Sequence, residues 1–378
     1  MMVHLHQGNV TWTEISRLHS EQRIVVPSLV ALAFAALRHS WVIPRETTFS
    51  VSLLFATLAI WWIVIVRLVA PARREWTLAL ITLLACSLTQ AENWTWGFQM
   101  SFFVANLCAA VMTLGFVMAD RPWSLPLGVS ALIVGSYSIG FGLTATASGM
   151  LFYALNRERW KFAGWAAVSI IILLFYRNDY QSTLYHPVNE PLTSRIADTT
   201  HFALIALGAP IARSAGIDWC GLIGFIAIAA LTPCVLLPWR RGRISEGSLA
   251  LVALASMPIL GAFEVAYGRL FEGLQAALGG RFTTPTSLLW ITLILVAARL
   301  RIRTRFIVPS VIPLALFWCW SQVGGYAEVR DHALSLFAAA QVIPRWNVAT
   351  EDEFPPLWPA EAELQYLYSI RDGPFYHP

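Results

Sequence analysis

Long apolar runs separated by short polar segments repeat along most of the chain. A helix that crosses a bilayer needs about 20 mainly apolar residues, and it satisfies its own backbone hydrogen bonds inside the lipid. The pattern therefore predicts an all-α protein, a polytopic transmembrane helical bundle of about ten spans with additional short interfacial helices. The expected spans are residues 48–67, 76–90, 100–119, 123–138, 143–156, 160–176, 219–238, 247–265, 285–300 and 306–322.

Two further apolar runs are shorter than the roughly 17 residues that a crossing requires. They cover residues 24–37 and 202–212. We expect both to form interfacial or re-entrant helices on the outer face. The chain then divides into three regions: an outer polar segment with an interfacial helix (1–47), a transmembrane domain (48–322) and an outer tail (323–378).

The placement of basic residues predicts the orientation, because short cytoplasmic loops of membrane proteins are enriched in arginine and lysine. The basic loops, expected in the cytoplasm, are 67–74, 121, 157–161, 240–243 and 299–305. The segments expected outside are 90–99, 138–143, 177–200 and 267–284.

Composition supports a membrane protein and excludes several functional classes. Hydrophobic residues make up 57% of the 378 residues and charged residues 13%, against about 25% charged in an average soluble domain. The five cysteines follow no metal-binding or disulfide spacing. We find no phosphate-binding glycine loop, catalytic-triad pattern or zinc signature. The sequence thus predicts no metal, no cofactor and no nucleic-acid partner, and it predicts membrane lipid as a partner.

A polar and aromatic island interrupts the apolar pattern at residues 90–99. A carboxylate near the hydrocarbon boundary is costly unless it is paired or faces water. Glu92 is therefore a candidate acid, base or hydroxyl ligand, while Trp94 could stack on a sugar ring and Gln99 could line the same cavity. The alternative is an aromatic belt at the membrane surface, with Glu92 in water.

Two other segments carry candidate chemistry. In the cluster before the first apolar run, His19, Glu21 and Arg23 could orient a phosphate or a sugar hydroxyl, since arginine presents a planar fork of donors. The alternative is the solvated start of an amphipathic helix. Arg281, with two threonines close behind it at an outer boundary, suits a lipid-linked phosphate. Its alternative is an arginine that snorkels from a helix end.

Two weaker candidates complete the outer side. Glu264 lies near the outer end of its expected span, where a structural ion pair with Arg269 is the default. The segment 177–200 contains acids and a histidine without a spacing that specifies a site, and we interpret it as a solvated loop.

The order of the three main segments resembles a group of bacterial polytopic proteins that are similar to GT-C glycosyltransferases. In that group the first segment typically reads His-Asn-Glu-His-Arg, the second Glu-Asn-x-x-Trp-Gly-Phe-Gln and the third Arg-Tyr-Thr-Thr. This chain has His-Ser-Glu-Gln-Arg at 19–23, Glu-Asn-Trp-Thr-Trp-Gly-Phe-Gln at 92–99 and Arg-Phe-Thr-Thr at 281–284. Each motif is short, but the resemblance extends from residue 19 to about residue 300.

The resemblance implies a GT-C-like fold in a bacterial inner membrane. It also implies transfer of a sugar from a polyprenyl-phosphate donor to an acceptor on the outer face, as part of cell-envelope chemistry. A general base would contribute roughly 10²–10⁴-fold to such a reaction. The implied catalytic residues are Glu21 and Glu92, and the implied substrate-binding residues are His19, Arg23, Trp94, Gln99 and Arg281.

The chain departs from this group in two ways. The opening transmembrane helix and the aspartates that follow it are missing, so we expect a start at an internal methionine and an incomplete or inactive enzyme. Gln22 replaces the usual histidine, which removes a group that titrates near neutral pH. The alternatives to an enzyme are a transporter or flippase of a lipid-linked saccharide and a non-catalytic membrane protein.

Overall fold

The structure is a computed structural model that describes residues 10–16, 18–19, 22–38, 43–95, 99–178, 191–240, 245–300 and 304–342. The fold is all-α, as predicted from the apolar runs. Within the described residues, β-structure is limited to an antiparallel ribbon of β1 (Leu18–His19) and β2 (Gln22–Arg23).

The helices follow the apolar runs. Those of the first half are α2 (Trp12–Ser16), α3 (Val25–Arg38), α4 (Ile43–Leu68), α5 (Arg74–Ala85), α6 (Ala91–Thr95), α7 (Met100–Val117), α8 (Ser124–Ser136), α9 (Thr144–Leu155) and α10 (Arg159–Arg177). Those of the second half are α11 (Leu192–Ala212), α12 (Ile217–Arg240), α13 (Glu246–Arg269), α14 (Gly280–Leu300) and α15 (Thr304–Val342). Short 3-10 helices join them, namely η1 (Pro71–Arg73), η2 (Leu88–Gln90), η4 (Gly140–Leu143), η5 (Arg213–Ala215), η6 (Leu270–Glu272) and η7 (Leu274–Leu278).

Five helices in the described part of the chain are long and apolar enough to cross a membrane. They cover Glu46–Leu68, Met100–Val117, Arg159–Arg177, Glu246–Glu272 and Gly280–Leu300. Helix α7 lies at the centre, since it packs against α4, α8, α13 and α14 and 72% of its apolar window is buried. Helix α10 is peripheral, with 22% of its window buried.

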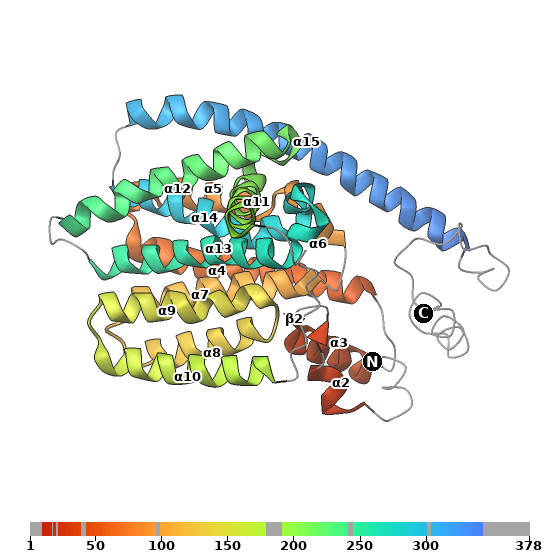
Figure 1. Ribbon diagram of the computed structural model, residues 1–378, viewed down its shortest axis with the longest axis horizontal. Helices are drawn as coiled ribbons and strands as arrows, with labels where there is room; N and C mark the ends of the chain where they lie inside the picture. The colour runs from red at the N-terminus through yellow and green to blue at the C-terminus, as the bar shows by residue number, and fades with distance from the viewer. Residues whose placement is uncertain are drawn as a thin grey trace.

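The loops sort to the two ends of the bundle (Figure 1). At one end the basic loops meet, where Arg299 donates to Ser245 and Lys161 donates to the carbonyl of Ala119. At the other end Val26 donates its backbone N–H to the carbonyl of Tyr137. Arg67, Arg121 and Arg299, from segments expected in the cytoplasm, therefore meet at one end of the bundle, and Phe141, Tyr267 and Phe282, from segments expected outside, meet at the other.

The two short apolar runs occupy different positions in the structure. Helix α3 is only 14 residues long and sits at the end of the bundle, beside the β-ribbon. The run 202–212, expected to form an interfacial or re-entrant helix, is the buried half of α11 and packs against α12, α13 and α14. In Figure 1, α11 is seen nearly end-on among helices that lie across the page. This second half is enclosed by other helices, whereas the first half, which includes Leu192 and Ile196, is largely exposed.

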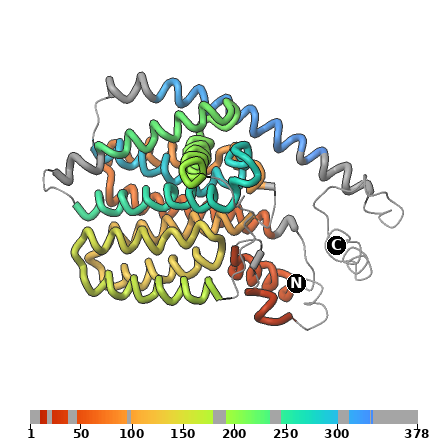
Figure 2. Tube along the Cα trace, viewed as in Figure 1, coloured from red at the N-terminus to blue at the C-terminus, as the bar shows by residue number. Residues whose placement is uncertain are grey.

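Region boundaries expected at 47/48 and 322/323 both fall inside helices, since α4 begins at Ile43 and α15 continues to Val342. Helix α15 has 39 residues. It crosses over the bundle, and its later part reaches the same end as the N-terminal helices (Figure 2). The remainder of the expected tail, residues 343–378, lies outside the described residues.

Candidate functional site

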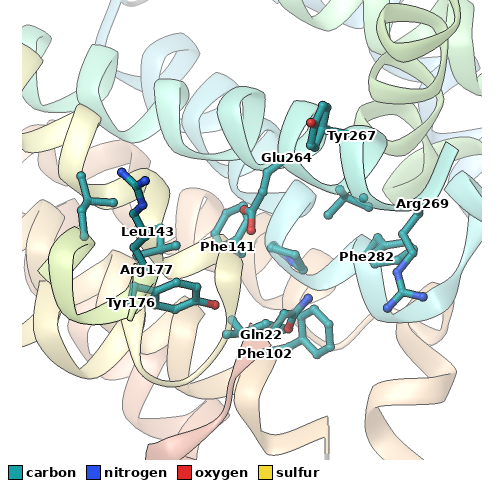
Figure 3. Close-up of a pocket in the computed structure, with 15 residues that line it drawn as sticks. Gln22, Phe102, Phe141, Leu143, Tyr176, Arg177, Glu264, Tyr267, Arg269 and Phe282 are labelled. Carbon is teal, nitrogen blue, oxygen red and sulfur yellow. The ribbon is translucent and has the colours of Figure 1, made fainter. Parts of the chain in front are cut away.

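A cavity of about 420 Å³ opens among η4, α10, α13 and α14, at the end of the bundle that carries α3 and α6 (Figure 3). Its walls are mainly apolar and aromatic, and its polar lining is sparse. The labelled lining residues are Gln22, Phe102, Phe141, Leu143, Tyr176, Arg177, Glu264, Tyr267, Arg269 and Phe282. An apolar cavity with a few convergent polar groups is the usual form of a small-molecule site.

Glu264 projects from α13 into this cavity, toward Gln22 of β2 (Figure 3). The approach depends on two glycines. A Cβ at Gly261 would overlap the ring of Phe141, so this glycine allows η4 to pack directly on α13. A Cβ at Gly140 would lie 2.3 Å from Glu264 Oε1 and 3.6 Å from Gln22 Cγ. The carboxylate therefore occupies the space that a side chain at position 140 would take.

Two guanidinium groups belong to the same cavity, Arg177 at the end of α10 and Arg269 at the end of α13. They lie on opposite sides of it in Figure 3. Arginine forks suit phosphate and carboxylate groups. The cavity thus combines a carboxylate, two cations and aromatic rings.

A chain of alternating charges leads from this cavity to the polar island. Arg269 Nη1 lies 2.5 Å from Glu272 Oε1, and Arg281 Nη2 lies 3.9 Å from Glu272 Oε2. Arg281 Nη1 in turn lies 3.9 Å from Glu92 Oε1, while its backbone N–H donates to Glu92 Oε2 at 3.1 Å. These side chains are partly exposed, and each such pair contributes roughly 0–1 kcal/mol. The network therefore orients these guanidinium and carboxylate groups but adds little to the free energy of folding.

The structure thus brings together two residues of the candidate site that lie far apart in the sequence, Glu92 and Arg281. Asn93 reinforces the contact, since its Nδ2 donates to the carbonyl of Arg281 at 3.1 Å and to Thr284 Oγ1 at 2.6 Å. The Thr284 hydroxyl donates to Gln90 Oε1 at 2.5 Å. The polarity of the island therefore serves largely to join η2 and α6 to the start of α14.

Arg213 also stabilises this junction between η2, α6 and the start of α14. Its guanidinium donates to the carbonyls of Leu278 and Thr89 and makes a two-pronged pair with Glu328, at 2.5 and 3.0 Å. A Cβ at Gly280 would come within 3.2 Å of Glu92 Cβ and 3.3 Å of Arg213 Nη1. This clamp could not be predicted from the sequence, because the hydrogen-bond partners of Arg213 come from three separate segments.

The Arg23 guanidinium is bound by backbone carbonyls of neighbouring segments. Its Nε donates to the carbonyl of Tyr176 at 3.2 Å, Nη1 to that of Ser16 at 2.6 Å, and Nη2 to that of Asn178. All three guanidinium nitrogens are thus engaged by backbone carbonyls. This arrangement joins the β-ribbon to the end of α10 and leaves the neighbouring Gln22 as the residue that faces the cavity.

Trp94 and Gln99 also pack inside the protein. The Trp94 indole donates to the carbonyl of Ser87 at 3.3 Å, and its ring lies 4.9 Å from that of Phe103. Gln99 is 4% exposed, and its Oε1 has no hydrogen-bond partner among the described residues. Glu21 lies outside the described residues, as does the side chain of His19, whose backbone belongs to β1.

The sequence favoured a structural ion pair for Glu264 and did not group it with Gln22, Tyr176 and Arg177, which line the same cavity. The available signal was the carboxylate itself, because an ionisable residue within an apolar span marks a functional site by default. Among the described residues, no group of three or more His, Cys, Asp and Glu side chains lies together as a metal site.

The chain was compared with known protein families, with curated proteins and with solved structures. None of them matches it. Functional interpretation therefore rests on the residues of the site.

Proposed function

We propose that the chain is a multi-pass protein of a bacterial inner membrane. It would act as a GT-C-like glycosyltransferase, moving a sugar from a polyprenyl-phosphate donor to an acceptor on the outer face. Five helices of suitable length and apolarity support the membrane assignment, and the segregation of basic loops to one end supports the orientation. The three sequence motifs supply the reaction class.

One observation carries the proposal. A single aromatic-lined cavity contains Glu264, Arg177 and Arg269, and it is linked through Glu272 to the Arg281–Glu92 pair. A lipid-linked sugar presents the groups that such a site would recognise: a phosphate, several hydroxyls and an apolar chain. Arginine binds the phosphate, a carboxylate binds hydroxyls, and aromatic rings cover the apolar parts.

In this reaction an acceptor hydroxyl loses its proton to a carboxylate as its oxygen bonds to the anomeric carbon. The bond between that carbon and the phosphate oxygen breaks, and the electron pair leaves with the polyprenyl phosphate. Glu264 takes the role of base, because it is the described carboxylate that projects into the cavity. Arg269 and Arg281 hold the phosphate, and Glu92 orients Arg281.

A transfer assay tests the proposal. The full chain in liposomes is supplied with a labelled polyprenyl-phosphate-linked hexose and with bacterial membrane extract as the source of acceptors. We expect label to move from the donor to a second product, and Glu264→Gln to slow transfer by about 10²-fold or more, the contribution of a general base. Glu75→Gln is the matched control, since Glu75 is exposed on α5, away from the cavity.

An unchanged transfer rate in a folded Glu264→Gln variant would show that Glu264 is not the base. Movement of intact donor across the bilayer without sugar transfer would instead identify a flippase. Neither transfer nor movement, with folded protein, would leave the enzyme and transporter assignments both refuted.

A further inference from the structure

A second, polar cavity of about 360 Å³ lies at the opposite end of the bundle, where the basic loops meet. It is formed by the ends of α4, α7 and α14 and by the start of α13. Three of these elements or the loops beside them each contribute one arginine: Arg67, Arg121 and Arg299. The cavity is thus a convergence of guanidinium groups from distant parts of the sequence.

Arg299 is held in place by the first turn of α13. Its Nη2 donates to Ser245 Oγ at 2.6 Å, and Ser245 in turn caps the helix by accepting from the backbone N–H of Ser248. A Cβ at Gly247 would lie 2.5 Å from Arg299 Nη1 and 2.7 Å from Leu68 Cδ2. Glycine at this position is what lets the guanidinium lie across the helix.

The cations of this cavity are only partly neutralised. Arg121 lies 3.4 Å from its neighbour Asp120, which also lines the cavity, as does Glu246. Arg67 is exposed, and its side chain makes no hydrogen bond or ion pair with the described residues. Three guanidiniums against two carboxylates leave a positive balance, with Arg67 available to an incoming anion.

We propose that this cavity is an anion site that binds a phosphate group. Arg67 and Arg299 supply the donors, and the N-terminus of α13, which lines the cavity, adds a favourable dipole. Basic pockets between membrane helices commonly bind the head groups of anionic lipids. The phosphate can come from such a lipid or from a soluble phosphate, and the two sources are separable by experiment.

The full chain in a mild zwitterionic detergent is titrated with short-chain phosphatidylglycerol, with short-chain phosphatidylcholine and with inorganic phosphate, and Tm is measured at each concentration. We expect phosphatidylglycerol to raise Tm and phosphatidylcholine to leave it unchanged. A rise with inorganic phosphate of the same size would identify a soluble ligand. A rise with phosphatidylglycerol alone would identify a lipid head group.

Three variants distinguish a built site from general positive charge. Arg67→Gln is expected to weaken phosphatidylglycerol binding by about fivefold, the effect of one arginine at an anionic surface. Gly247→Ala is expected to weaken it as well, because the new methyl displaces the Arg299 guanidinium while every charge is kept. Arg159→Gln is the control, since Arg159 is exposed at the start of α10 and does not line the cavity.

The proposal is overturned if no phosphate-bearing ligand shifts Tm. Equal losses in Arg67→Gln and Arg159→Gln would also overturn it, since they would show attraction to the whole basic end. Full binding by a folded Gly247→Ala variant would exclude Arg299 from the site. None of these outcomes depends on glycosyl transfer.

Discussion

Replacing Gly140 with alanine tests the placement of the Glu264 carboxylate without changing any charge. The added Cβ would lie 2.3 Å from Glu264 Oε1, whereas ordinary contact begins at 3.4 Å. The carboxylate oxygen must therefore retreat by about 1 Å, a displacement that can cost about 10²-fold in rate when a reacting group is involved. Gln22 is far enough, at 3.6 Å, to stay where it is.

The fold should tolerate this substitution. The atom that must move is the far end of a flexible side chain, and Gly140 has no positive φ that alanine would resist. A glycine-to-alanine change at a compatible backbone position stabilises by about 0.4–1 kcal/mol through the unfolded state. Gly140→Ala is thus expected to slow the proposed sugar transfer while leaving the free energy of unfolding unchanged or slightly higher.

The measurement combines the sugar-transfer rate with Tm for Gly140→Ala and for Gly164→Ala. Gly164, on α10, is a matched control because an added Cβ there meets only Leu125 Cδ2, at 3.8 Å. We expect a loss of rate in the first variant alone, with Tm of both close to that of the unchanged protein. Full activity in a folded Gly140→Ala protein would refute the idea that Glu264 must sit where it does.

Two further predictions concern the packing that supports the site. Arg213→Lys is expected to destabilise by about 1–2 kcal/mol, measured as a lower Tm, because one ammonium cannot replace the fork that holds Glu328; an unchanged Tm would show that the clamp contributes nothing. Gly208→Ala is expected to lower Tm by the equivalent of about 1–3 kcal/mol, since its Cβ would overlap the backbone carbonyl of Cys220 and push α11 from α12. Equal Tm values for Gly208→Ala and Gly164→Ala would contradict that close approach.

The apolar pattern was sufficient to predict an all-α fold and the approximate positions of most helices. Periodicity could not show that α5 would stop at Ala85, where the chain continues as η2 and α6. It also could not show that residues 202–212 would be enclosed by other helices, because surface and interior apolar runs of this length look alike. The count of ten spans remains a prediction.

The candidate site was accessible from sequence only in part. Glu92 and Arg281 could be proposed as neighbours because both were expected at outer ends of spans, and they are in contact. The backbone partners of Arg23 and the position of Glu264 in the cavity wall could not be predicted in this way. Which side of a helix faces a cavity depends on contacts such as those made by Gly140 and Gly261, and those contacts join segments more than a hundred residues apart.

Glu272 gives the proposed phosphate site a resident counter-ion. Its two carboxylate oxygens face Arg269 and Arg281, at 2.5 and 3.9 Å, so both guanidiniums already have an anionic partner. A phosphate that binds here must displace this carboxylate. The displacement costs little free energy, because partly exposed ion pairs are weak. The proposed donor is a phosphodiester with one negative charge, whereas the polyprenyl phosphate released by transfer is a monoester with nearly two. Displacement of Glu272 therefore favours the product over the donor, and the resident carboxylate limits how tightly both guanidiniums hold the donor.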